Sequence, residues 1–183
     1  LRQAHVRSQA DGVHVLHRFS QRLQSQGRQV LTFTVDPGAE SDEAILHLLK
    51  YQVDGVVLAA AQLSTRMTSI CHERGIPIVL FNRYIPGSDA SGVRCDNAAG
   101  GRLIADAFLE AGAKSFAMIT GDPKGTTSQD CVRGFVERLL EEGFRRGDIL
   151  ELPGQSSYEG ASEVTYATFG ERKVPVPDAL FGI

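Results

Sequence analysis

The sequence predicts an α/β protein in which parallel sheets are covered by helices on both faces. Strand-like apolar runs alternate along the chain with helix-like segments of ~10–15 residues, which is the order typical of βαβ units. The strand-like runs are almost continuously apolar, as expected of strands that are buried on both faces. The alternation starts again near residue 91, so a second set of elements follows the first.

In the first set, each element follows from local periodicity. Gly27 is a suitable end for the first helix, Ser64 is a suitable N-cap for the third, and Pro77 stands at the second position of a strand edge, where proline is tolerated. The predicted helices are 13–26, 42–51 and 64–75, and the predicted strands are 30–35, 53–61 and 76–81.

In the second set, Asp96 and Asn97 are expected to cap a helix, and residues 84–91, rich in Pro, Gly and Ser, are the best linker candidate. The predicted helices are 97–112, 128–143 and 158–169, and the predicted strands are 91–95, 115–120 and 179–183, with a short strand or turn at 148–152. Ligands of parallel sheets bind beyond the carboxyl ends of the strands. The loops at 59–64, 82–88, 95–98 and 121–131 are therefore the places to search for a site.

Composition narrows the function classes. The chain has 183 residues, a formal net charge of −3 and 42% hydrophobic residues, which suits a soluble globular protein and does not favour nucleic-acid binding by bulk charge. No apolar run approaches the ~18 residues of a membrane helix, so no membrane partner is expected. The three cysteines, Cys71, Cys95 and Cys131, are widely spaced and predict free thiols in a reducing cytoplasm.

Known catalytic and nucleotide-binding motifs are missing from the sequence. It has no G-x-G-x-x-G after a strand, no Walker-type phosphate loop and no G-x-S-x-G elbow, and residues 121–127 resemble a phosphate loop only loosely. We therefore predict no cofactor, no metal site and no enzyme activity. One alternative stays open: Cys131, at the predicted helix mouth, could be a nucleophile if the helix dipole lowered its pKa.

Five segments share their order and spacing with one family. They are VDGVVL at 53–58, GIPIVLFNR at 75–83, VRCDN at 93–97 with GGRL at 100–103, the segment 128–135 that ends in RGF, and PDALF at 177–181. Together they resemble the effector-binding domain of LacI/GalR-family transcriptional regulators, from about residue 15 to residue 183.

The resemblance implies a two-lobed periplasmic-binding-protein-like (type I) fold, with an N-terminal lobe at 1–95, a C-terminal lobe at 96–183 and a small-molecule cleft between them. It implies a cytoplasmic homodimer that acts as the effector-sensing and dimerisation domain of a DNA-binding regulator, most simply a repressor. The partner would be a small-molecule effector, a sugar or a related metabolite. A periplasmic solute-binding protein of a transporter shares the fold and is the alternative.

The sequence departs from the family pattern at both ends. It holds no helix-turn-helix, so operator DNA is expected to be a partner only through a domain that is not in this chain. The polar segment LRQAHVRSQADG stands where the family has its first hydrophobic strand, and the chain stops at ALFGI, where the family continues. We therefore expect a fold that is incomplete at both ends, a fragment of the domain.

The resemblance also assigns effector-binding positions, which here are Asn82, Cys95, Cys131, Ser156 and Ala59. Cys131 stands where the family usually has a pocket arginine, and Ser156 where it usually has an aromatic platform. Arg133 cannot replace that arginine directly, because two residues along a helix turn through ~200°. We therefore expect an effector that is not a free sugar bound in the usual way, but is larger, less hydroxylated or absent.

Overall fold

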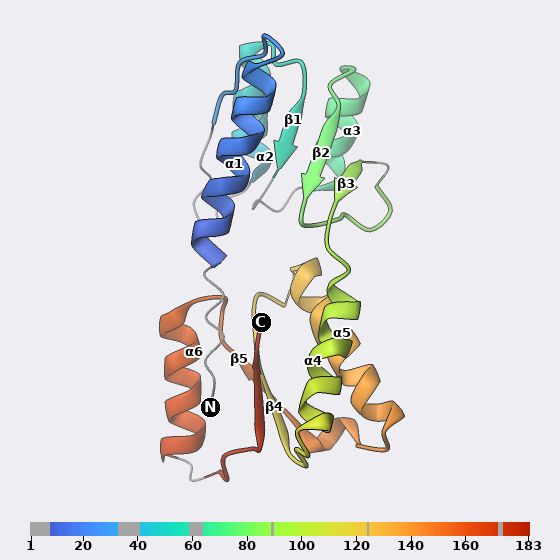
Figure 1. Ribbon diagram of the computed structural model, residues 1–183. Helices are drawn as coiled ribbons and strands as arrows, with labels where there is room; N and C mark the ends of the chain where they lie inside the picture. The colour runs from blue at the N-terminus through green and yellow to red at the C-terminus, as the bar shows by residue number, and fades with distance from the viewer. Residues whose placement is uncertain (1–7, 33–40, 59–63, 89, 124, 172–173) are drawn as a thin grey trace. The chain divides into compact units, whose positions relative to one another are not determined.

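The computed structural model describes residues 8–32, 41–58, 64–88, 90–123, 125–171 and 174–183 (Figure 1). The chain divides into two compact units, Leu1–Ala39 and Glu40–Ile183, and each is described by itself. The lobe boundary expected between residues 95 and 96 stays a prediction. No helix of the described residues is long and apolar enough to cross a membrane.

The described part of the first unit contains helix α1, Ser8–Gln24, and the turn that follows it. Gly27 adopts a φ of 75° there, and the N–H of Arg28 donates to the carbonyl of Leu23 at 3.0 Å, which closes the helix as expected. The strand predicted at 30–35 is wrong for residues 30–32, which form no strand, while residues 33–35 lie outside the described part. A strand needs a neighbour to pair its backbone groups, and the described residues of this unit contain none.

In the second unit, a first sheet has the order β1-β2-β3, and all its strands are parallel. The elements are α2 (Ser41–Leu48), a 3₁₀ turn (Leu49–Tyr51), β1 (Val56–Leu58), α3 (Thr65–Glu73), β2 (Ile78–Phe81) and β3 (Ser91–Val93). Ser64 caps α3 as expected, since its hydroxyl accepts the N–H of Met67. The linker interpretation of residues 84–91 is wrong: this segment joins two strands of one sheet, and Ile85 packs on that sheet's core.

The core of the first sheet is small. It consists of Leu49, Val56, Leu58, Met67, Cys71, Ile78 and Leu80. The Cys71 thiol is fully buried there, and burial raises its pKa, with an opposing contribution from Arg74. This cysteine is therefore a packing residue.

A second sheet has the order β5-β4-β6 and is again entirely parallel. Its elements are α4 (Asn97–Glu110), β4 (Phe116–Thr120), α5 (Thr126–Glu141), a 3₁₀ turn (Arg146–Asp148), β5 (Ile149–Pro153), α6 (Tyr158–Thr165), a π-helical turn (Tyr166–Glu171) and β6 (Ala179–Gly182). Figure 1 shows α4 and α5 side by side on one side of this sheet and α6 on the other. The predicted α/β fold with parallel sheets flanked by helices is confirmed.

Helices α4 and α5 touch through two glycines. A Cβ atom at Gly134 would overlap the Ala98 carbonyl, and one at Gly101 would lie 2.8 Å from the backbone nitrogen of Phe135, inside van der Waals contact. The two backbones can approach this closely only because neither position carries a side chain. This contact fixes α5, which supplies part of the candidate site, against α4.

An aromatic cluster fills the core beneath α5. Phe135 is fully buried, and its ring centroid lies 6.0 Å from that of Phe108, 6.4 Å from that of Phe116 and 5.2 Å from that of Phe181. The first two pairs are edge-to-face and the third is tilted, and aromatic pairs at such distances stabilise a core beyond the area that they bury. The second sheet therefore provides a well-packed base for the loops at its carboxyl end.

Candidate functional site

The loop after β2 meets the first turn of α5. The Thr127 hydroxyl donates to the Asn82 carbonyl at 2.8 Å, and the Tyr84 N–H reaches the Thr126 hydroxyl at 3.5 Å. These contacts join segments that leave two different sheets at the carboxyl ends of their strands. Parallel sheets bind ligands at these ends. Asn82, predicted from the sequence, therefore lies where a ligand-binding residue is expected.

A buried carboxylate, Asp130, gathers polar side chains beside that contact. Its side chain keeps 11% of its surface exposed and lies 3.5 Å from the Arg94 guanidinium and 2.8 Å from that of Arg133. The Tyr84 hydroxyl donates to it at 3.4 Å, and the Arg94 guanidinium stacks 4.3 Å above the Tyr84 ring. Arg94 and Tyr84 come from the loops after β3 and β2, whereas Asp130 and Arg133 belong to α5.

Two hydroxyls converge on Gly121, directly after β4. The Ser156 hydroxyl accepts the N–H of Asp122 at 2.9 Å. A Cβ atom built on Gly121 would lie 2.6 Å from the Ser156 oxygen and 3.5 Å from that of Ser128. The absence of a side chain at this position therefore makes room for the two serines, one of which, Ser156, was predicted from the sequence.

Left-handed backbone conformations are concentrated in these loops. Among the described residues, four that are not glycine have a positive φ, and three of them are Asn82 (56°), Gln155 (55°) and Ser156 (54°). Such conformations are unfavourable for residues with a side chain, least so for asparagine, and they persist where the surrounding structure imposes them. Asn82 directly follows β2, and Gln155 and Ser156 follow β5 after Gly154, so these unfavourable conformations lie at strand ends.

Arg83 and Asp122 form a second pair of charged residues at the strand ends. Burial lowers the pKa of the Arg83 guanidinium from its ordinary value, and the nearby Asp122 carboxylate opposes this effect. Arg83 directly follows Asn82, and Asp122 directly follows Gly121. Opposite charges therefore lie beside both polar clusters of the site.

Cys131 does not lie at the helix mouth. Helix α5 begins at Thr126, two residues before the predicted start, so Cys131 lies in its second turn, beyond the range of the helix-end dipole. Burial raises the pKa of its thiol, and the adjacent Asp130 carboxylate raises it further. The alternative of a low-pKa nucleophile at Cys131 is therefore wrong, and the thiol is neutral at neutral pH.

Cys95 and Ala59 are the remaining site residues that were predicted from the sequence. Cys95 is exposed in the loop after β3, next to Arg94, and its carbonyl accepts the N–H of Asn97 at 3.0 Å. The neighbouring Asp96 caps α4 by accepting the N–H of Ala99 at 2.9 Å, as the cap prediction expected. Ala59 lies outside the described residues. The assignment of all five residues to effector binding stays a prediction.

Sequence reasoning missed the residues that make the most contacts in the site. Tyr84, Arg94, Asp130, Thr127 and Ser128 were passed over, although Arg94 and Asp130 each adjoin a residue that was predicted. Arg94 directly precedes Cys95, and Asp130 directly precedes Cys131. A charged residue at each of two expected ligand loops was the signal that was available.

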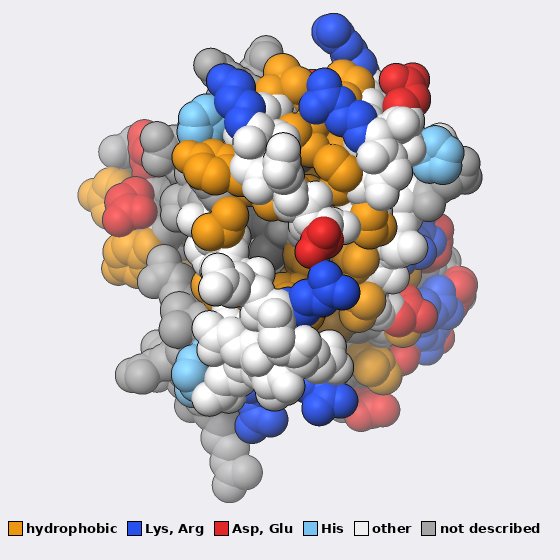
Figure 2. All heavy atoms as spheres, turned by 90° about the horizontal axis from the view of Figure 1, so that it is seen from above, with side chains coloured by type: hydrophobic (Ala, Val, Ile, Leu, Met, Phe, Trp, Pro, Cys, Tyr) orange, Lys and Arg blue, Asp and Glu red, His pale blue; other side chains and the backbone are white. Residues whose placement is uncertain are grey.

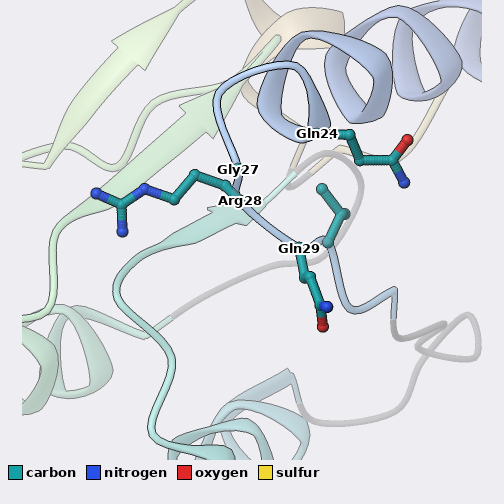
Figure 3. A pocket seen from close by; sticks show the side chains of 5 residues that line it. Gln24, Gly27, Arg28 and Gln29 are labelled. Atoms are coloured by element: carbon teal, nitrogen blue, oxygen red, sulfur yellow. The ribbon is translucent and has the colours of Figure 1, made fainter.

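Two shallow hollows lie away from the strand ends. One lies at the turn after α1, where Figure 3 shows the Arg28 and Gln24 side chains pointing in different directions. The other lies between α3 and the segment before β3, near His72 and Ser88, at the amino ends of β2 and β3. Side chains that diverge, and a position at the amino ends, make both hollows weaker candidates than the strand-end loops.

Surface charge and metal-ligand geometry add little to the site. On the face seen in Figure 2, basic, acidic and hydrophobic side chains are interspersed, which agrees with the small net charge. Within the described ranges, no group of three or more His, Cys, Asp or Glu side chains is placed to hold a metal ion.

Comparison with known proteins places this geometry in context. No protein-family model matches the chain. Catabolite control protein A of Staphylococcus aureus is 28% identical over 148 residues, which cover 81% of this chain and 44% of that protein. The chain thus spans less than half the length of the curated relatives that it matches.

Solved structures agree at the level of the fold. The Cra transcriptional dual regulator of Pseudomonas putida, in complex with fructose 1-phosphate, has a TM-score of 0.79 at 22% identity and covers 93% of this chain and 63% of its own. A LacI-family regulator of Enterococcus faecium with bound ribose has a TM-score of 0.76 at 19% identity, with 93% and 62% covered. Both of these solved structures are of transcriptional regulators. The chain is therefore homologous to catabolite control protein A and similar over most of its length to the effector-binding domain of LacI-family transcriptional regulators, as its sequence predicted.

Proposed function

We propose that this chain senses a small-molecule effector for a transcriptional regulator and that the effector binds beside the strand ends of the two sheets. The main structural support is the convergence of the loops after β2 and β3 on the start of α5, seen in the contact of Thr127 with the Asn82 carbonyl. The position agrees with the ligand rule for parallel sheets. The homology to catabolite control protein A supports the regulatory role.

The chemistry of the site favours an effector that is not held as a free sugar usually is. Such a pocket combines an aromatic platform with charged, bidentate groups that fix hydroxyls. Here Cys131 offers a neutral thiol and Ser156 a short hydroxyl. One face of the Tyr84 ring is already covered by Arg94. A larger or less hydroxylated metabolite fits these groups better than a monosaccharide.

Regulation by this chain requires that the effector bind two conformational states with different affinity. We propose a cytoplasmic homodimer with a repressor role, in which operator DNA is contacted by a separate helix-turn-helix domain. This assignment is supported by the regulators to which the chain is homologous. Sedimentation equilibrium of the chain at micromolar concentration tests the dimer, and a monomer at all concentrations would contradict it.

Titration calorimetry tests the effector proposal with ribose, fructose 1-phosphate, a disaccharide and a nucleoside as probes. We expect ribose to give no micromolar binding and one of the larger or phosphorylated probes to bind. Asn82→Gly should weaken that binding about tenfold or more by removing the amide, because one lost hydrogen bond to a charged or buried partner has this size. Glycine keeps the positive φ of this position, so the loop conformation is retained.

Arg145→Ala is the matched control, because Arg145 pairs with Asp148 on the surface, away from the strand ends that form the candidate site. It should leave the affinity unchanged. Micromolar binding of ribose would sink the proposal of an unusual effector. Equal affinities of the Asn82→Gly variant and the unchanged protein for the same probe would remove Asn82 from the site.

A further inference from the structure

Among the described residues, several side-chain contacts between the two sheet regions come from one short stretch of α5, beside the pair of Arg83 and Asp122. Thr126, Thr127 and Asp130 supply them, and they meet Asn82, Tyr84 and Arg94. The two contacts of Tyr84 with α5 join residues that are 42 and 46 positions apart in the sequence. The amino-terminal part of α5 therefore contributes to holding the two halves of the unit, the first and the second sheet with their loops, together at the candidate site.

Asp130 differs from the two threonines because its side chain is buried and charged. Taking a carboxylate out of water is costly unless positive groups and hydrogen-bond donors surround it. Arg133 comes from the same helix, one turn further on, and satisfies one oxygen at 2.8 Å. The other partners, Arg94 and Tyr84, come from the loops of the first sheet. The burial of Asp130 is thus stabilised partly by side chains from the opposite half.

The two partners from the first sheet also support each other. The Arg94 guanidinium lies 4.3 Å over the Tyr84 ring, so each restricts the rotamers of the other. Tyr84 follows β2 and Arg94 follows β3, and these loops flank the predicted residues Asn82 and Cys95. A change at Asp130 would therefore reach both loops at once.

We propose that Asp130 is a positioning residue of the effector site, which sets the loops at 82–84 and 94–96 against α5. The regulatory meaning of this role rests on the proposed function, because an effector beside Cys131 would bind next to the carboxylate that joins the two halves. The positioning itself does not depend on any effector. Its loss should loosen the loops of the first sheet while the second sheet stays intact.

Hydrogen exchange followed by mass spectrometry tests this in the ligand-free chain. Asp130→Asn keeps the size of the side chain and removes its charge. We expect exchange of the peptide that covers 82–97, which includes the N–H groups of Asn82 and Asn97 bonded to carbonyls, to increase roughly 5- to 30-fold. Peptides from β4 and α4 should be unchanged. Asp148→Asn, which breaks the exposed pair with Arg145 in the same half, is the matched control and should change neither region.

Arg94→Gln is a second variant. It removes the exposed guanidinium that pairs with Asp130 and changes no residue of α5. It should loosen the same peptide, and the double variant Arg94→Gln with Asp130→Asn should add little to either single change. Unchanged exchange at 82–97 in both single variants would overturn the proposal. So would strictly additive effects, because they would mean that Asp130 and Arg94 act independently.

The role of Asp130 and the binding of an effector can each fail without the other. If exchange at 82–97 increases in the Asp130→Asn variant but calorimetry detects no effector binding to the unchanged protein, Asp130 is still a positioning residue. That outcome would count against the proposal that the chain senses an effector. If the Asp130→Asn variant binds the effector normally and its exchange at 82–97 is unchanged, the proposal of an effector sensor stands. The positioning role of Asp130 is then rejected. Increased exchange in every peptide, including β4, would show a general loss of stability and would also overturn the proposal.

Discussion

The two sheets of the second unit differ in how well they are built. The strands of the first sheet have three or four residues, and every residue of β3 is exposed. The strands of the second sheet have four or five residues, and its core contains the buried ring of Phe135 with aromatic neighbours. The second sheet should therefore be the more stable of the two, and it bears the helix that reaches across to the first.

This difference suits a sensing domain. Regions that move in regulation are drawn from the less stable parts of a protein, because opening them costs little. The first sheet contributes Asn82, Tyr84 and Arg94 on loops, whereas the second contributes Asp130 and Thr127 on a helix fixed by close packing. We infer a firm base on one side of the site and a more adaptable set of loops on the other.

Removing the Phe135 ring should have the largest effect. Phe135→Ala should destabilise the protein by about 3–5 kcal/mol, because a fully buried ring is lost and a cavity is left. Leu80→Ala, at the equivalent depth in the first sheet, should cost about 2–5 kcal/mol but act locally. Urea unfolding combined with hydrogen exchange checks this. Equal loss of protection in both sheets for Leu80→Ala would show one cooperative unit and break the comparison.

Adding a side chain at the glycine contact between α4 and α5 should have the next largest effect. Gly134→Ala should cost about 1–3 kcal/mol in the free energy of unfolding, at the upper end of this range, because its Cβ meets backbone that cannot swing away. Gly100→Ala, on α4, is the control, since a Cβ atom at this helical glycine would meet nothing within 4 Å. That change should stabilise by up to about 1 kcal/mol through helix propensity. A neutral Gly134→Ala would mean that the helices can move apart.

Much of the fold could be predicted because periodicity and caps are local. Ser64 and Asp96 were expected to cap helices, and both do. The start of α5 was missed because Thr126 and Thr127 are weak helix formers and Gly125 offers no side-chain cap. Residues 30–32 of the strand expected at 30–35 were misassigned because their apolar pattern says nothing about whether a partner strand is present.

The site could be predicted only as a set of loops. The rule of strand ends selected the loops that hold Asn82 and Cys95, and these loops follow β2 and β3. Ser156, which the family resemblance assigned, lies in the loop after β5. The contact of Tyr84 with Asp130 spans 46 residues and depends on how α5 is turned about its axis. That rotation is set by the packing of Gly101 and Gly134 against the neighbouring helix, which no local pattern encodes.

Chemical labelling of the three cysteines compares the stability of the two sheets at single residues, and its expected effect is the smallest. Cys71 is fully buried in the first core, Cys131 is half-buried on α5, and Cys95 is exposed. We expect iodoacetamide to label Cys95 first. Cys71 should be labelled through opening of the first sheet alone, at least about tenfold faster than global unfolding allows. Peptide mass spectrometry of labelling against time measures this, with urea-unfolded protein as the reference.

The pH dependence of these two thiols follows from their raised pKa values. Burial favours the neutral thiol of Cys71 and Cys131 in the folded state, so the unfolded chain releases protons at lower pH. Their stabilising contribution is therefore complete below the ordinary thiol pKa of about 8.5 and is lost as the pH rises through the raised folded values. Cys131→Ser should reduce this loss of stability in urea titrations above that pH.

The labelling of Cys71 can still contradict the comparison of the two sheets. If Cys71 is labelled no faster than the protein unfolds globally, the first sheet opens only together with the second, and the two sides of the site are equally stable.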